Sequence, residues 1–200
     1  MYVAFEGIDT AGKSTQIALA KDAFSDAVVT KEPGGTELGM KIRALLLESG
    51  CVTPRSETLL FLADRAEHIE KVIRPNLHRI ILSDRSFISG IAYAHIHEKL
   101  PIDILLQLNR FATDGIFPDR IVLLRMDEKV LRTRLERKRR DAIESRGIEY
   151  MMAVQKCMLE LLDLLQIDHI AIDAAQPAEK IAEAIKNYLR QPFEKGYKKP

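Results

Sequence analysis

The sequence lacks the features that define several broad protein classes. No apolar run approaches the roughly 18 residues that a membrane-spanning helix needs. The amino-terminal segment has neither the basic start nor the apolar stretch of a secretory signal. With 10 glycines and 8 prolines in 200 residues, the composition is not that of collagen or a low-complexity chain. We therefore expect a folded protein that does not associate with membranes.

The chain also contains little cysteine and has almost no net charge. Cys51 and Cys157 are too few for a disulfide scaffold, and no cysteine–histidine cluster has the spacing of a zinc site. Reduced thiols of this kind indicate a cytoplasmic protein. The formal net charge of +1 argues against a general basic surface for nucleic acid, so we expect no nucleic-acid partner.

Hydrophobic residues make up 46% of the chain, and they alternate between two periodicities. Short apolar runs predict buried strands at 2–6, 27–31, 79–83, 120–125 and 168–172. Longer stretches of helical period predict helices at 13–24, 37–48, 55–76, 87–98, 101–114, 128–139, 147–166 and 178–190. This order favours one α/β domain over 1–190, with a five-stranded parallel sheet between helices and a tail at 191–200. Ligands of such sheets bind at the carboxyl ends of the strands.

A phosphate-binding motif follows the first predicted strand. The residues GIDTAGKS at 7–14 match G-x-x-x-x-G-K-[ST] between a strand and a helix, which predicts a P-loop NTPase-type three-layer sandwich. The backbone N–H groups would surround the phosphates, Lys13 would reach the β- and γ-phosphates and Ser14 would hold Mg²⁺. The ATP-binding residues predicted from this segment are Gly7, Ile8, Asp9, Thr10, Ala11, Gly12, Lys13, Ser14 and Thr15. The alternative is an ordinary glycine-rich turn.

The loop alone indicates a nucleoside triphosphate but no particular reaction. A GTP-dependent switch would need N-K-x-D and a separate D-x-x-G motif. The first is absent, and the D-x-x-G at 9–12 lies inside the phosphate loop itself. A switch function is therefore disfavoured, and small-molecule kinases remain.

Three further motifs follow in order: EPGGT at 32–36, FLADR at 61–65 and DRSFISGIAY at 84–93. With these motifs the chain resembles the thymidylate kinase (dTMP kinase) family from residue 2 to about 185. The resemblance implies transfer of the ATP γ-phosphoryl group to dTMP, which gives ADP and dTDP for DNA precursor synthesis. A kinase for another (deoxy)nucleotide or nucleoside is the alternative enzyme, and a non-catalytic nucleotide-binding regulator is the alternative from another class.

The resemblance also implies roles for residues on the acceptor side. Arg85 would bind the dTMP phosphate, Phe61 would stack on thymine and Arg65 would donate to a thymine carbonyl. The alternatives are a salt bridge of Arg85 with Asp84 or Glu32, a core position for Phe61 and a surface ion pair for Arg65.

Other acceptor-site residues come from the same motifs. The resemblance implies that Tyr93 crowds the 2′ position of the sugar, unless it is a half-buried core tyrosine. Asp9 and Glu32 would lie near the acceptor and Mg²⁺, and Ser89 and Gly90 would form the floor beside the base.

A basic run, RTRLERKRR at 132–140, is either a solvated helix face or part of a lid near 137–148. The phosphate loop contains no arginine, so the resemblance implies the bacterial type, in which the lid supplies the catalytic cation. The candidates are Arg137, Arg139 and Arg140, and the acids Asp141 and Glu144 would approach the acceptor sugar. Adenine would lie between Arg134 and the turn at 173–175.

The nucleophile would be a phosphate oxygen of dTMP, which is largely dianionic at neutral pH and needs no general base. Family resemblance and the apolar residues of the long helical segment also predict a homodimer. Those residues are Leu59, Leu60, Leu62 and Ala63.

Overall fold

The computed structural model describes residues 1–47, 53–136 and 147–192. Its centre is a five-stranded parallel sheet with strand order β2-β3-β1-β4-β5. The predicted fold class is confirmed. The strands are β1 (Tyr2–Glu6), β2 (Val28–Lys31), β3 (Ile81–Asp84), β4 (Arg120–Arg125) and β5 (His169–Asp173).

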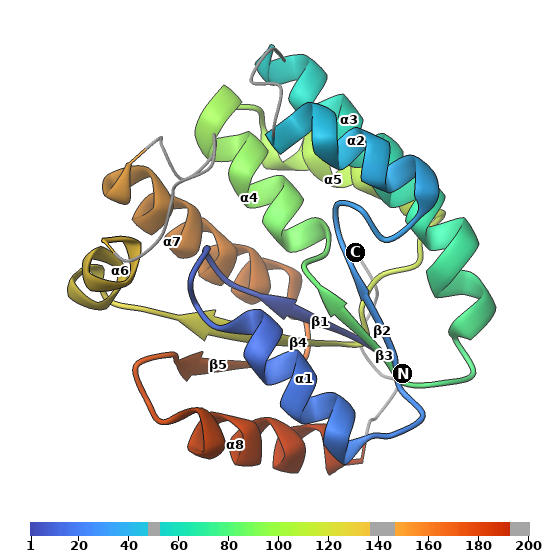
Figure 1. Ribbon diagram of the computed structural model, residues 1–200. Helices are drawn as coiled ribbons and strands as arrows, with labels where there is room; N and C mark the ends of the chain where they lie inside the picture. Colours follow the sequence, from blue (N-terminus) through green and yellow to red (C-terminus); the bar gives the residue numbers. More distant parts are fainter. Residues whose placement is uncertain (48–52, 137–146, 193–200) are drawn as a thin grey trace.

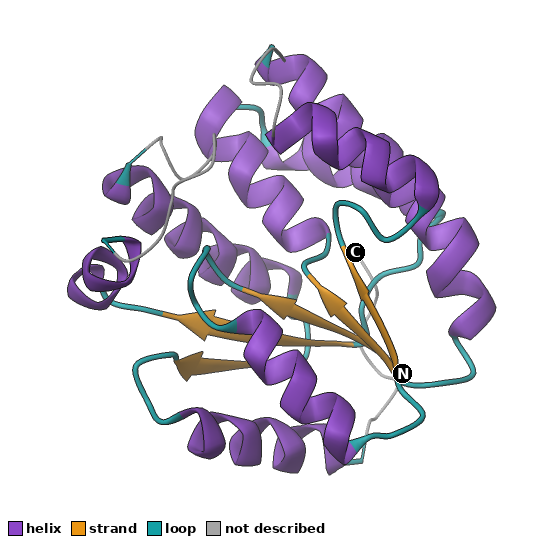
Figure 2. Ribbon diagram, in the orientation of Figure 1, coloured by secondary structure: helices purple, strands orange, loops and turns teal. Residues whose placement is uncertain are grey.

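Helices cover both faces of the sheet (Figures 1 and 2). On one face α1 (Lys13–Ala23) packs against α8 (Ala178–Arg190), and on the other α4 (Phe87–Glu98) packs against α7 (Ile148–Leu165). Every residue of β1 is buried, as expected for a strand whose two faces are both covered. None of the helices in the described ranges is long and apolar enough to cross a membrane.

Three more helices extend the structure beyond α4. In Figure 1, α2 (Glu37–Leu47), α3 (Pro54–His68) and α5 (Ile102–Thr113) lie together above the carboxyl ends of β2 and β3. Helix α3 packs against both α2 and α5, and it also contacts α4. The short α6 (Glu128–Leu135) follows β4. Helices α2, α3 and α5 therefore lie next to the carboxyl ends of the strands, where ligands are expected to bind.

One predicted helix differs from the structure. The segment predicted at 55–76 is α-helical only to His68 and continues as a π-helix over Ile69–Ile73 and a 3₁₀-helix over Arg74–Asn76. The reason is Pro75, which has no N–H to donate and whose ring clashes with the carbonyl one turn earlier. The helix predicted at 128–139 is observed as α6, and its predicted last residues lie outside the described ranges.

The strand order creates a crevice between β1 and β3. After β1 the chain crosses to β2, at the edge of the sheet beyond β3. After β3 it crosses in the opposite direction, past β1, to β4. In parallel sheets ligands bind at such a reversal. The segments that follow β1 and β3 are GIDTAGKS at 7–14 and Arg85 with its neighbours, so the fold brings the two main predicted motifs to one place.

Candidate active site

The phosphate loop connects β1 to α1, whose first residue is Lys13. Two glycines have backbone conformations that other residues rarely adopt, Gly7 with φ 140° and Gly12 with φ 95°. A β-carbon on Gly7 would lie only 2.4 Å from the carbonyl oxygen of Leu124 in β4. The loop therefore needs glycine at this position both for its conformation and for its close approach to the sheet.

Lys13 extends back over the loop. Its buried Nζ donates to the carbonyl oxygens of Gly7 at 3.0 Å and Ile8 at 3.3 Å. Burial, together with the nearby positive charge of Arg85, lowers the pKa of this amine to about 8. An amine held in this way lies where the bound phosphates of a nucleotide would meet it.

Ser14 and Asp84 meet across the crevice. The Ser14 hydroxyl lies 3.5 Å from Oδ2 of Asp84, which ends β3. The other carboxylate oxygen, Oδ1, is buried without a hydrogen-bond partner among the described residues. A hydroxyl beside an incompletely paired carboxylate is a donor set that fits Mg²⁺. Thr15, the next residue of α1, is exposed.

Arg134 of α6 connects the phosphate loop to the turn after β5. Its Nη1 donates to the carbonyl oxygen of Thr10 at 2.8 Å, and its Nη2 donates to that of Ala174 at 2.6 Å. Thr10 has φ 66°, which is strained for a β-branched residue. Arg134 thus lies beside the turn at 173–175 that the sequence predicts to contact adenine.

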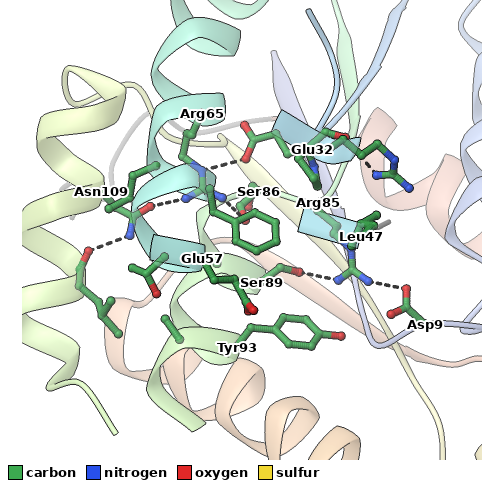
Figure 3. Close-up of a pocket in the computed structure, with 18 residues that line it drawn as sticks. Asp9, Glu32, Leu47, Glu57, Arg65, Arg85, Ser86, Ser89, Tyr93 and Asn109 are labelled. Carbon is green, nitrogen blue, oxygen red and sulfur yellow. Dashed lines mark hydrogen bonds and ion pairs between the residues drawn. The ribbon is translucent and has the colours of Figure 1, made fainter. Parts of the chain in front are cut away.

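A pocket opens between the phosphate loop and helices α2 to α5 (Figure 3). Its lining contains every described residue that the sequence predicts on the acceptor side, namely Asp9, Glu32, Phe61, Arg65, Arg85, Ser89, Gly90 and Tyr93. Arg137, Arg139, Arg140, Asp141 and Glu144 lie outside the described residues. Figure 3 shows Arg65 at one end of the pocket and Arg85 beside Asp9 at the other.

Arg85 is held by the phosphate loop. Its Nη2 donates to Asp9 at 2.6 Å, and its Nη1 donates to the carbonyl oxygen of Gly7 at 3.2 Å and to Ser89 Oγ at 3.0 Å. The acidic partner in its salt bridge is Asp9 rather than Asp84 or Glu32. Burial opposes its charge, but Asp9 together with Tyr93, Asp84 and Glu6 outweighs that effect and raises the pKa of Arg85. Its φ of 74° is rare for a residue with a side chain and typical of active sites.

Glu6 supports this end of the pocket from below. Its carboxylate is fully buried, accepts a hydrogen bond from Ser86 Oγ at 2.6 Å and also accepts from the Ser89 hydroxyl. Burial raises the pKa of Glu6. Because Ser89 in turn accepts from Arg85, a hydrogen-bonded chain runs from the end of β1 to the guanidinium.

Arg65 is held differently, by partners on three elements. Its Nε donates to Glu32 Oε2 at 2.8 Å, its Nη1 to Asn109 Oδ1 at 2.6 Å and its Nη2 to the Ser86 carbonyl at 3.1 Å. The Arg65 side chain is 4% exposed, so its ion pair with Glu32 is buried and does not lie on the surface. Phe61, one turn earlier on α3, is half-buried and lines the pocket.

Glu32 belongs to a buried network below the EPGGT loop. Its second oxygen lies 2.9 Å from His68 Nδ1, and His68 Nε2 lies 2.6 Å from Thr30 Oγ1. Burial acts to raise the pKa of Glu32, but Arg65 and His68 outweigh it, so the pKa is lowered. Asp64 accepts from the Gly34 amide at 2.9 Å, and burial together with Glu32 raises its pKa to about 6.

Sequence reasoning missed several residues of the site. The DRSFISGIAY motif predicts no metal role for its first residue, Asp84, and no motif contains Arg43 or Asn109, although both line the pocket. A signal exists for Arg43, a cation next to the buried Ile42 on α2. The sequence around Asn109 has no such signal, because its contact with Arg65 joins α5 to α3.

Comparison with known proteins agrees with this geometry. The family model described as thymidylate kinase matches residues 5–185. A thymidylate kinase of Sulfurimonas denitrificans is 50% identical over 189 residues, which cover 94% of this chain and 99% of that protein. The chain belongs to the thymidylate kinase family.

Other thymidylate kinases support the assignment. That of Wolinella succinogenes is 51% identical over 181 residues, which cover 90% of this chain and 94% of that protein. The crystal structure of thymidylate kinase from Ehrlichia chaffeensis matches with a TM-score of 0.75 and 26% identity, over 95% of this chain and 98% of that one. Membership of the thymidylate kinase family confirms the prediction of an ATP-dependent nucleoside monophosphate kinase, a phosphotransferase.

Proposed function

We propose that the protein transfers the γ-phosphoryl group of ATP to dTMP, with dTDP and ADP as products. One observation carries the proposal: a single pocket has an arginine at each end, and one of these arginines contacts the phosphate loop. Such a pocket suits an acceptor with a base at one end and a phosphate at the other. The phosphate end faces the donor site, as phosphoryl transfer requires.

On the donor side, the loop amides and Lys13 would hold the β- and γ-phosphates. Arg134 would pack on adenine against the turn at 173–175. Ser14 and Asp84 would hold Mg²⁺, which neutralises phosphate charge as the γ-phosphoryl group moves. Both carboxylate oxygens of Glu32 are engaged, one by Arg65 and the other by His68. We therefore assign Glu32 the role of positioning Arg65 rather than that of a metal ligand.

On the acceptor side, Arg85 would exchange its contact with Asp9 for the dTMP phosphate, and Arg43 adds a third guanidinium to the pocket lining. Phe61 would stack on thymine, a contact worth about 1–3 kcal/mol. Tyr93 lies beside Arg85, with the guanidinium carbon 5.4 Å from the ring centroid. Its bulk would crowd a 2′-hydroxyl and favour deoxyribose.

The dTMP phosphate would attack directly, because a phosphomonoester is largely dianionic at neutral pH. The remaining requirement is positive charge on the transferring group. Lys13 and Arg85 supply part of it, and we assign the rest to Arg137, Arg139 or Arg140 of a lid within a single domain over 1–190. Neutralising all three should lower kcat by orders of magnitude with little effect on the KM for dTMP.

The decisive test of this function is ADP formation from ATP, Mg²⁺ and dTMP. The wild-type protein should turn over, and Lys13→Ala should lose nearly all turnover while it still binds dTMP in a calorimetric titration. Wild-type protein that binds ATP but phosphorylates no monophosphate would refute the proposal and favour a nucleotide-binding regulator.

We also propose a cytoplasmic homodimer formed through α2, α3 and α5. Large apolar side chains are exposed on all three helices, among them Met40, Leu59 and Phe111, the last 88% exposed. Of the residues on which the dimer prediction rests, Leu62 is buried and lines the pocket, so it would not contribute. Exposed apolar surface of this extent is typical of an interface.

Sedimentation at micromolar concentration tests the dimer. A species near twice the chain mass of 22.7 kDa is expected, and Phe111→Asp should convert it to monomer. Leu164→Asp is the matched control, because Leu164 is exposed on α7, away from the three helices. A wild-type species near 22.7 kDa would contradict the proposal.

A further inference from the structure

Asn109 lies at the end of the pocket that we assign to the base. It comes from α5, is 2% exposed and lines the pocket. Its Oδ1 accepts a hydrogen bond of 2.6 Å from Nη1 of Arg65 on α3. Figure 3 shows the two side chains pointing toward each other from opposite helices.

The amide of Asn109 can take only one orientation. Its Nδ2 donates to the Leu105 carbonyl at 2.7 Å, one turn earlier on α5. A guanidinium has donors and no acceptor, so a flipped amide would place N–H against N–H at Arg65 and oxygen against oxygen at Leu105. Asn109 is therefore a fixed acceptor for Arg65.

The position of the Arg65 guanidinium is closely defined as a result. Each of its three nitrogens has a different partner: Glu32, Ser86 and Asn109. The space beside it is also tight, because a β-carbon on Gly90 would lie 2.9 Å from both terminal nitrogens. A guanidinium carries five N–H groups, and these three bonds use three of them, which leaves donors on the terminal nitrogens for a ligand.

We propose that Asn109 is a positioning residue that sets the selectivity of the pocket for the acceptor base. The inference rests on the proposed function. Thymine presents a carbonyl oxygen at position 4, whereas cytosine presents an amino group there. A guanidinium held in one place donates to the carbonyl oxygen of thymine and meets the amino group of cytosine donor to donor. An arginine free to move could turn away from cytosine and would discriminate less.

The test compares kcat and KM for dTMP and dCMP in the wild-type protein, Asn109→Ala and Asn109→Asp. Asn109→Ala should raise the KM for dTMP about tenfold, the size of one charge-assisted hydrogen bond, with kcat within about threefold. The ratio of kcat/KM for dTMP to that for dCMP should fall about tenfold. Asn109→Asp keeps an acceptor for Arg65 but loses the donor to the Leu105 carbonyl, so it should recover part of that ratio.

Thr113→Val, an isosteric change one turn further along α5 and outside the pocket lining, is the matched control and should leave the ratio unchanged. Asn109→Ser, too short to reach Arg65, replaces the alanine variant if that variant does not fold. Parallel losses for dTMP and dCMP, or an unchanged ratio in an active Asn109→Ala protein, would overturn the inference. Wild-type protein inactive on dTMP would instead refute the proposed function.

Discussion

Arg65 and Arg85 lie at opposite ends of one pocket, but the protein holds them in different ways (Figure 3). The Arg65 side chain is 4% exposed and is bonded to partners before β3, after β3 and on α5. The Arg85 side chain is 16% exposed, and its carboxylate partner Asp9, on the phosphate loop, is 24% exposed. One guanidinium is enclosed, and the other lies at the border with solvent.

The difference in burial between the two arginines matches the two groups that they would bind, a base at Arg65 and a phosphate at Arg85. Burying an ion pair is costly, and such a pair is best explained where it fixes one geometry, as reading a planar base requires. An ion pair near solvent contributes little to stability, so its guanidinium can exchange a carboxylate for a phosphate at small cost. The base end is thus preorganised, and the phosphate end is ready for exchange.

The largest expected effect comes from removing the cation at the phosphate end. Arg85→Ala should lower kcat by about 10³-fold or more and also raise the KM for dTMP, because the cation at the reacting phosphate is lost. Steady-state kinetics measure both. Arg74→Ala, which removes only exposed ion pairs with Glu70 and Asp114, is the matched control and should change neither. If Arg85→Ala kept a kcat and a KM for dTMP near those of the wild type, Arg85 would be only a structural ion-pair partner of Asp9.

A smaller effect is expected from the support beneath Arg85. Ser89→Ala removes both its 3.0 Å bond from Arg85 and one of the two hydroxyl partners of Glu6, and should raise the KM for dTMP about three- to tenfold. Glu6→Gln keeps the shape but removes the buried charge and should act in the same direction. If both variants keep the wild-type KM, Asp9 and Gly7 alone position Arg85.

The donor side offers a test by pH. Burial holds the pKa of Lys13 at about 8 in the free protein, and bound phosphates would raise it by favouring the charged amine. ATP binding should therefore take up a fraction of a proton near pH 8.5 and almost none at pH 6.5. Calorimetry in two buffers of different ionisation enthalpy measures the uptake. Uptake that persists in Lys13→Met would assign the proton to another group.

The smallest expected effect concerns stability. Because the pKa of Asp64 is raised from 3.8 to about 6, the folded state binds more protons than the unfolded state between these values. The ionised Asp64 therefore lowers the free energy of unfolding. This destabilisation is fully present above pH 6 and is lost as the pH falls toward 3.8. Asp64→Asn should raise Tm by a few degrees at pH 8 and by less at pH 5. An equal change at both pH values would exclude the charge as the cause.

Much of the fold could be predicted because its signals are local. Each of the five strands was predicted within two residues at either end, and β1 and β4, which are covered on both faces, read as nearly continuous apolar runs. The stretch predicted to be helical at 55–76 is helical to Asn76, but its change to π- and 3₁₀-helix after His68 could not be predicted, because periodicity does not register the effect of Pro75 on hydrogen bonding.

In the candidate site, too, residues within local motifs could be predicted, whereas contacts between distant segments could not. Lys13 and Arg85 follow strands within recognisable motifs, so the sequence alone indicates where they lie. The partners of Arg65 could not be read, because Glu32, Ser86 and Asn109 are far apart in sequence and meet only when α3 packs against α5. Which acid pairs with Arg85 was likewise decided by the shape of the phosphate loop, and Asp9 was not among the partners considered.

The central claim is that one end of the pocket reads thymine and the other holds its phosphate. The most direct measurement is kcat/KM with ATP and Mg²⁺ across dTMP, dUMP, dCMP, AMP and thymidine. We predict the highest value for dTMP, a much lower one for dCMP and AMP, and no turnover of thymidine, which has no phosphate for Arg85. A preference for another acceptor, or turnover of thymidine comparable with that of dTMP, would contradict the account.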